Sequence, residues 1–88
     1  MAHFVYILYS PAQDIYYKGY STRPYKRLKE HNQGLSRYTS GKGPWKLVYL
    51  ESFATKREAL IREKSLKRAN REYIEWLIRQ PNNLANKL

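Results

Sequence analysis

Two runs of apolar and aromatic residues, joined by a short turn, limit the possible folds of this chain more than any other feature. Residues 3–9 are apolar, β-branched or aromatic and end at Ser10-Pro11, which is a turn signal. Residues 15–20 form a second run of the same kind. Because the connection is so short, we expect the two runs to pair as an antiparallel hairpin.

Alternation along these two strands places particular side chains on common faces. Successive side chains of a strand point to opposite sides, so Tyr6 and Leu8 share one face of the first strand. Tyr17 and Gly19 share one face of the return strand. If the two faces coincide, Tyr6 and Tyr17 are neighbours across the hairpin.

The remaining elements follow from helix caps, hydrophobic spacing and turn residues. Ser21 or Thr22 can cap a helix that tolerates Pro24 in its first turn. Residues 55–58 have the pattern of a capping box, which marks the start of another helix. The predicted elements are a helix over 23–31, a basic loop over 35–44, a strand over 45–53, a helix over 55–69 and a helix over 70–80.

A hairpin, a third strand and three helices predict a small protein of the α/β type, more closely the α+β class. A chain of 88 residues has room for one such domain and not for two. We expect residues 1–80 to form it. Residues 81–88 are polar and rich in asparagine, and we expect them to fray.

Charge is the strongest signal in the composition. The chain has 17 Lys and Arg against 7 Asp and Glu, which gives a formal net charge of +10. Cations that neutralise phosphates gain affinity by releasing counterions, so a polyanion is the expected partner. The cations are scattered through the sequence and do not line one amphipathic helix, which favours nucleic acid over a membrane surface.

Other compositional features suggest where such a protein works. There is no cysteine, which fits a reducing compartment. The first residues lack the basic segment and long apolar run of a secretory signal, and no uncharged apolar stretch has the length of a membrane span. We therefore expect a soluble, cytoplasmic protein.

Glu63 is the residue that fits a plain core least well. A helical wheel places it between Ala59, Leu60 and Leu66 on the apolar side of its helix. A carboxylate in such a position costs several kcal/mol unless it is paired, hydrogen-bonded or bound to a metal. One hypothesis is an ion pair with Arg27 or another arginine. The other is a ligand for Mg²⁺ or a similar hard cation.

The other candidates also have two interpretations each. Tyr6 and Tyr17, taken singly, are typical of core aromatics in a chain with nine tyrosines. Helical spacing puts Arg27 and His31 on one side of their helix. Arg27 is equally typical of plain surface charge, and His31 of a cation stabilised by the helix C-terminus.

The ordered set of motifs resembles the GIY-YIG nuclease superfamily, and most closely its short, stand-alone bacterial members. The resemblance covers about residues 3–69. It rests on Val5-Tyr6-Ile7, Tyr17-Lys18-Gly19, Arg27-Leu28, His31-Asn32, Tyr38-Thr39, Pro44-Trp45, Ala59-Leu60, Glu63 and Leu66-Lys67. Two residues depart from the usual pattern: Val5 replaces the first-motif glycine, and Lys18 replaces an apolar or small residue. Neither departure removes a catalytic side chain.

The resemblance implies a three-stranded antiparallel sheet flanked by helices, with a metal-dependent phosphodiesterase site on its face. By analogy, Tyr6 and Tyr17 are the motif tyrosines and Arg27 is the helix arginine. His31 is the histidine one turn later, and Glu63 is the metal ligand. The implied function is endonuclease-type hydrolysis of nucleic acid, in DNA repair, recombination or structure-specific cleavage, with DNA favoured over RNA.

Hydrolysis of a phosphodiester defines the role expected of each of these residues. Glu63 binds Mg²⁺ or Mn²⁺, and Arg27 contacts the phosphate. Tyr17, with Tyr6 beside it, positions or deprotonates the water, which requires nearby cations to lower a phenol pKa from about 10. His31 is the rival base, because an imidazole titrates near neutral pH without such help.

Basic and aromatic residues near these motifs are candidates for contact with nucleic acid. A non-catalytic nucleic-acid-binding module that uses the same face is the alternative function. A protein partner for targeting is a further possibility, with the chain itself a monomer or weak dimer. The candidate contacts are Lys18, Arg23, Lys26, Arg37, Tyr38, Lys42 and Trp45.

Overall fold

The computed structural model describes residues 2–87, with side chains described as far as residue 86. Its elements are β1 (His3–Ser10), β2 (Ile15–Ser21), α1 (Pro24–Asn32), β3 (Lys46–Phe53), α2 (Lys56–Arg68), α3 (Arg71–Ile78) and the 3₁₀ helix η1 (Leu84–Lys87). Within this part of the chain, no helix combines the length and the apolar character needed to cross a bilayer.

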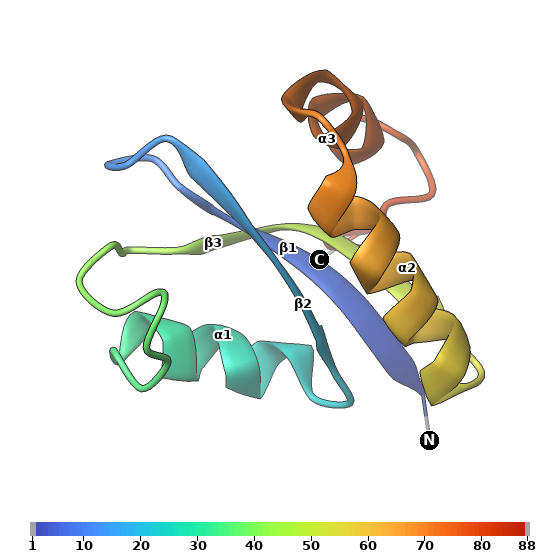
Figure 1. Cartoon of the computed structure of the whole chain (residues 1–88), viewed down its shortest axis with the longest axis horizontal. Coiled ribbons are helices and arrows are strands. Elements are labelled where there is room, and N and C mark those ends of the chain that lie inside the picture. The colour runs from blue at the N-terminus through green and yellow to red at the C-terminus, as the bar shows by residue number, and fades with distance from the viewer. Residues whose placement is uncertain (1, 88) are drawn as a thin grey trace.

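The three strands form one sheet in the order β2-β1-β3, and both pairings are antiparallel (Figure 1). β1 is the central strand because its residues are apolar on both faces, whereas β2 and β3 form the edges. The predicted α+β class and three-stranded antiparallel sheet are confirmed.

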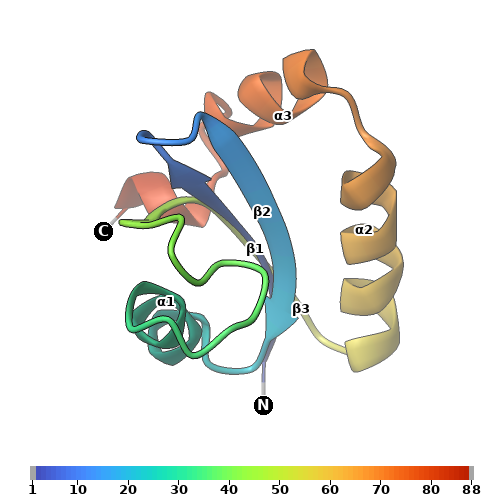
Figure 2. The ribbon, with the colours of Figure 1, turned by 60° about the vertical axis from the view of Figure 1, so that its left-hand side comes forward.

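Each face of the sheet has its own core. α1 lies on one side of the sheet and α2 on the other (Figure 2). Val5 and Ile7 of β1 pack in one cluster with apolar residues of α2 and α3. Tyr6 and Leu8, which alternate with them, pack in the other cluster with Leu28 of α1. Alternation in β1 therefore sends Tyr6 to the side of the sheet that α1 covers.

The register of the hairpin brings the two motif tyrosines together. Tyr6 lies opposite Gly19, and Leu8 lies opposite Tyr17. Paired residues share a face, so Tyr6 and Tyr17 are diagonal neighbours, with ring centroids 6.4 Å apart. The two faces therefore coincide, which is the condition under which the sequence makes Tyr6 and Tyr17 neighbours.

The predicted N-cap is found for α2 but not for α1. Thr55 caps α2, and its hydroxyl accepts a hydrogen bond from the backbone N–H of Glu58. The N-cap of α1 is Arg23, which makes no side-chain cap, and not Ser21 or Thr22. Pro24 occupies the first turn of α1 and has no N–H, so there is less for a cap to satisfy.

The apolar side of α2 is narrower than the sequence suggested. Ala59 and Leu66 are fully buried, but Leu60 is 39% exposed and Ile61 is 60% exposed. The prediction that Leu60 belongs to the core is therefore wrong. The helix packs on the sheet along one line of small and apolar residues, which leaves its outer side to solvent.

Residues 81–86 do not fray, and the prediction of a loose tail is wrong for this described part. Asn83 is 1% exposed, and Leu84 and Ala85 pack against the core on the side of Tyr6. The Asn83 amide accepts a hydrogen bond from the Leu50 N–H (3.0 Å) and donates one to the Val48 carbonyl (2.8 Å). These bonds satisfy the outer edge of β3 in place of another strand.

We expect Asn83→Ala to lower the free energy of unfolding by roughly 2–4 kcal/mol, because two buried backbone groups of β3 lose their partners. Urea denaturation measures this change. Asn82→Ala is the matched control, since Asn82 is exposed, and its effect should stay within about 0.5 kcal/mol. Equal effects of the two substitutions would contradict the edge-capping role.

Candidate active site

The ring of Tyr6 crosses strand β2 directly above Gly19. A β-carbon placed on Gly19 would lie 2.5 Å from both Cζ and Oη of Tyr6, which is far inside contact distance. Only a glycine lets the ring lie so close to the backbone of the edge strand. The Tyr6 side chain thereby carries its hydroxyl across β2, away from its own strand.

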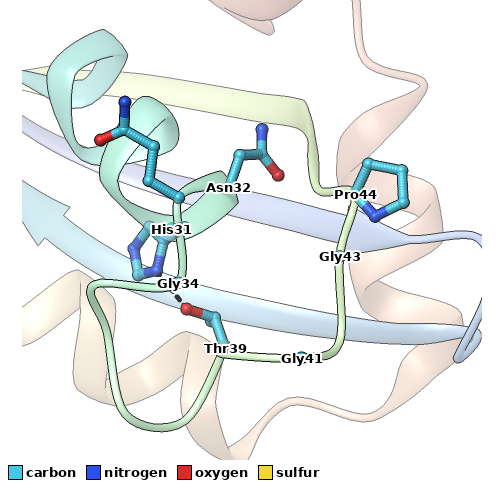
Figure 3. Close-up of a pocket in the computed structure, with 8 residues that line it drawn as sticks. His31, Asn32, Gly34, Thr39, Gly41, Gly43 and Pro44 are labelled. Carbon is cyan, nitrogen blue, oxygen red and sulfur yellow. Dashed lines mark hydrogen bonds between the residues drawn. The ribbon is translucent and has the colours of Figure 1, made fainter.

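His31, near the end of α1, meets this hydroxyl. The imidazole is 1% exposed, and its Nε2 lies 3.0 Å from Tyr6 Oη. Its other nitrogen, Nδ1, lies 2.7 Å from Thr39 Oγ1 (Figure 3). The ring also packs against Tyr17, with centroids 4.9 Å apart. Both ring nitrogens therefore have a buried hydroxyl partner.

Burial sets the protonation states of this pair. Burial lowers the pKa of His31, and the positive charge of Arg27 lowers it further. Burial also raises the pKa of Tyr6 to about 12, with a further rise from Tyr17, while Arg27 acts in the opposite direction. At neutral pH the pair is a neutral imidazole beside a protonated phenol. At Tyr6, burial therefore outweighs the effect of the neighbouring Arg27 on the phenol pKa.

Arg27 lies one turn before His31 on α1 and faces the same hydroxyl. Its Nη1 forms an ion pair with Glu30 Oε1 at 2.8 Å, and this pair raises the arginine pKa. Tyr6 also raises the pKa of Arg27. With a side chain that is 35% exposed, Arg27 is the cation of this group that a ligand in solvent can reach.

Glu63 lies on α2, on the other side of the sheet from α1. Its side chain is 19% exposed and pairs with Lys67, at 3.6 Å between Oε2 and Nζ. Its negative charge contributes to the raised pKa of Tyr6. The predicted alternative of an ion pair with Arg27 is not found, because Arg27 pairs with Glu30.

The residues around Glu63 offer a metal ion one carboxylate. The described residues contain no group of three or more His, Cys, Asp and Glu side chains that could enclose an ion. Mg²⁺ is commonly held by one or two carboxylates together with water and substrate phosphates. A single half-buried carboxylate such as Glu63 fits that kind of site and not a preformed metal cage.

Tyr38 and Lys42 cover the outer side of Tyr17. The rings of Tyr17 and Tyr38 are stacked, with centroids 5.6 Å apart. Lys42 Nζ lies 4.0 Å from the centroid of the Tyr38 ring and donates a hydrogen bond to the Tyr38 carbonyl. The loop between α1 and β3 thus places an exposed aromatic ring against Tyr17, with a cation over that ring.

The remaining candidates for nucleic-acid contact divide into three groups. Arg23, Lys26 and Arg37 are exposed and available. Lys18 lies opposite Ile7, on the face of the sheet that α2 covers, so it is turned away from Tyr17. Trp45 is 3% exposed, and a nucleic-acid strand cannot reach a ring in the core. The prediction that Trp45 contacts nucleic acid is therefore corrected.

The buried Trp45 instead fixes the loop that follows α1. Its indole N–H donates to the Thr39 carbonyl at 3.1 Å, and Asn32 bonds both backbone polar groups of Trp45. A cavity of about 400 Å³ lies between the end of α1 and this loop, beside His31 and Thr39 (Figure 3). Sequence reasoning gave no role to Thr39, Asn32 or Gly19, although all three lie within the motifs that it singled out.

One protein family has a model that matches most of this chain. The family model described as the GIY-YIG catalytic domain matches residues 2–76, and the chain belongs to this family. A UPF0213 protein of Bacillus licheniformis is 46% identical over 79 residues, which are 84% of this chain and 80% of the relative. The UPF0213 protein YazA of Bacillus subtilis is 37% identical over 82 residues, which are 92% and 82% of the two chains.

A solved structure has the same fold. The solution NMR structure of the UPF0213 protein BH0048 from Bacillus halodurans is 35% identical in sequence, with a TM-score of 0.60. The match covers 99% of this chain and 94% of that one. The family supports a nuclease-like role for the chain, while the names of the UPF0213 relatives state no specific activity.

The lowered pKa of His31 predicts how stability depends on pH. Because the unfolded chain binds this proton more tightly than the folded chain, protonation favours unfolding. The stability that depends on neutral His31 is fully present above about pH 6.5. It is lost as the pH falls from there through the pKa of His31 in the folded chain, and the free energy of unfolding changes by at most about 1.4 kcal/mol for each pH unit. Urea denaturation between neutral and mildly acidic pH measures it. A His31→Gln variant with an unchanged slope would contradict this assignment.

Proposed function

We propose that this protein is a divalent-metal-dependent nuclease that hydrolyses phosphodiester bonds in nucleic acid, with DNA favoured over RNA. One observation carries the proposal most directly. The Tyr6 hydroxyl lies 3.0 Å from Nε2 of the buried His31, and the partly exposed Arg27 lies one turn before His31 on α1. We assign proton acceptance to Tyr6 and His31, phosphate binding to Arg27, and metal binding to Glu63 of α2.

Arg27 is the residue that binds the scissile phosphate in this proposal. Its planar guanidinium presents paired donors that suit two phosphate oxygens. The present partner, Glu30, is three residues away on the same helix, and both side chains are partly exposed. Such pairs contribute only about 0–1 kcal/mol, so a phosphate can compete for the guanidinium.

His31 and Tyr6 together take the proton of the attacking water. His31 Nε2 lies within hydrogen-bond distance of the Tyr6 hydroxyl, so we place Tyr6 between the imidazole and the attacking water. As water attacks phosphorus, its proton goes to Tyr6 Oη while the Tyr6 proton goes to Nε2. One P–O bond forms, the other breaks, and the leaving oxygen takes a proton from solvent. No free phenolate is needed, which agrees with the raised pKa of Tyr6.

Glu63 is the residue that holds Mg²⁺ or Mn²⁺ in this proposal. When bound, the cation supplies positive charge to the phosphate oxygens and to the leaving group. The ion pair between Glu63 and Lys67 is long, at 3.6 Å, and the Lys67 side chain is 56% exposed. Lys67 can therefore move into solvent at little cost and leave the carboxylate to a cation.

Cleavage of a substrate panel tests the proposal. The panel contains single-stranded, duplex, flap and four-way-junction DNA, with the matching RNAs, incubated with Mg²⁺, Mn²⁺ or EDTA. We expect cleavage of at least one DNA in the presence of either ion, none in EDTA, and slower cleavage of RNA. Binding without cleavage across the panel would favour the alternative, a basic module that uses Tyr38 and Lys42 to hold nucleic acid.

A further inference from the structure

Thr39 is a buried residue in contact with His31 that the proposed reaction leaves without a role. It belongs to the loop between α1 and β3, and it is 1% exposed. Its Oγ1 lies 2.7 Å from His31 Nδ1 and 3.4 Å from the Ser36 carbonyl oxygen. Thr39 thus stands on the opposite side of the imidazole from Tyr6.

A neutral imidazole carries one N–H, so two proton arrangements fit these distances. In the first, Nδ1–H donates to Thr39, the threonine hydroxyl donates to Ser36, and Tyr6 donates to Nε2. In the second, Nε2–H donates to Tyr6, and the threonine hydroxyl donates to Nδ1. Only the first arrangement leaves His31 with a free electron pair toward Tyr6.

The surroundings of Tyr6 and Thr39 favour the first arrangement. Tyr6 is 1% exposed, and the guanidinium that its hydroxyl faces, Arg27, can only donate. If Nε2 also donated, the Tyr6 proton would have no acceptor among these neighbours. In the first arrangement every proton of the chain Tyr6–His31–Thr39–Ser36 has an acceptor.

We propose that Thr39 is a positioning residue that fixes the Nδ1–H tautomer of His31 and so aims Nε2 at the Tyr6 proton. The tautomer rests on the hydrogen bonds together with the burial of Tyr6 and the donor-only character of Arg27, whereas its use in catalysis rests on the proposed nuclease function. The same hydrogen bond holds the imidazolium in place after proton transfer, because Nδ1 keeps its proton and Thr39 remains the acceptor.

The loop holds Thr39 firmly enough for this role. The Thr39 carbonyl accepts hydrogen bonds from the Trp45 indole at 3.1 Å and from the Lys42 backbone N–H at 3.2 Å. The loop that carries Tyr38 and Lys42 to the substrate side of the site therefore also sets the proton on the base. The buried Trp45 thus helps to hold Thr39 against His31.

Nitrogen NMR of the imidazole tests the inference without any substrate. In ¹⁵N-labelled protein, long-range ¹H–¹⁵N spectra near pH 8 should show His31 with Nδ1 protonated and Nε2 bare. His31→Gln identifies its signals against those of His3. Thr39→Ser, which keeps the hydroxyl, should retain this tautomer. Valine has nearly the same shape as threonine but no hydroxyl. In the Thr39→Val protein we therefore expect His31 to carry its proton on Nε2, or to populate both tautomers.

Cleavage assays then link the tautomer to catalysis. We expect Thr39→Val to slow cleavage by about 10–100-fold, as for the loss of a histidine's outer hydrogen-bond partner, and Thr39→Ser to restore most of it. An Nε2–H tautomer in the wild type would overturn the inference, as would an unchanged tautomer in a folded Thr39→Val protein. If the tautomer is as expected but no variant cleaves anything, the nuclease function fails while the assignment of Thr39 stands.

Discussion

Glu63→Gln is expected to lower the rate of metal-dependent cleavage by more than about 100-fold, because it removes the carboxylate that holds the metal in the proposed site. Glutamine keeps the length and shape of the side chain but not its charge. The substitution raises the net charge by one from +10, so affinity for a polyanion should not fall. Cleavage of end-labelled DNA and fluorescence anisotropy measure the two effects separately.

Glu72→Gln is the matched control for this result. Glu72 lies in the first turn of α3 and is exposed. Its replacement by glutamine changes the net charge by the same amount as Glu63→Gln. It should cleave at the wild-type rate. Cleavage that survives in Glu63→Gln at a rate close to that of Glu72→Gln would remove Glu63 from the reaction. Loss of DNA affinity along with cleavage would make its role one of substrate binding.

Gly19→Ala is the second substitution for which we expect a large effect. The new β-carbon would lie 2.5 Å from Cζ and Oη of Tyr6, so the ring must leave its place across β2. Overpacking of this kind lowers the free energy of unfolding by about 1–3 kcal/mol. The Tyr6 hydroxyl would also move away from His31, and a displacement of about 1 Å at a reacting group is enough to slow a reaction about 100-fold.

A double-mutant cycle separates this clash from general damage to the strand. In a Tyr6→Leu background the shorter side chain no longer crosses Gly19, so adding Gly19→Ala should destabilise the protein much less. Urea denaturation of the four proteins gives the coupling energy. A coupling energy near zero would show that Gly19 is needed for some reason other than the Tyr6 ring that lies over it.

The hairpin and the alternation of its side chains were predictable because a strand has a fixed period. Alternation grouped the side chains on each strand, and the register then shows that Tyr6 and Tyr17 share a face. Glu63 was recognisable as a charge on the buried flank of a helix. The partner of Glu63 could not be recognised from the sequence. Lys67, one turn away on the same helix, is flexible and competes for the Glu63 carboxylate with any arginine that the fold brings near.

Other parts of the site depend on contacts that leave no periodic trace in the sequence. Asn83 looks like a residue of a polar tail, yet its amide pairs with an open strand edge that only the folded sheet creates. Thr39 and Trp45 lie in a basic loop that resembles a surface segment. Their burial follows from hydrogen bonds to α1 and within the loop, which join residues far from any regular spacing.

Anomalous diffraction from Mn²⁺ in crystals grown with a phosphorothioate DNA strand tests the central claim most directly. We predict one manganese peak bonded to the Glu63 carboxylate on the side of Tyr6, with Lys67 displaced and Arg27 on the phosphate. Crystals of Glu63→Gln should lack the peak. A manganese ion bound elsewhere, with Glu63 still paired to Lys67, would contradict a metal-dependent site built from Tyr6, Arg27, His31 and Glu63.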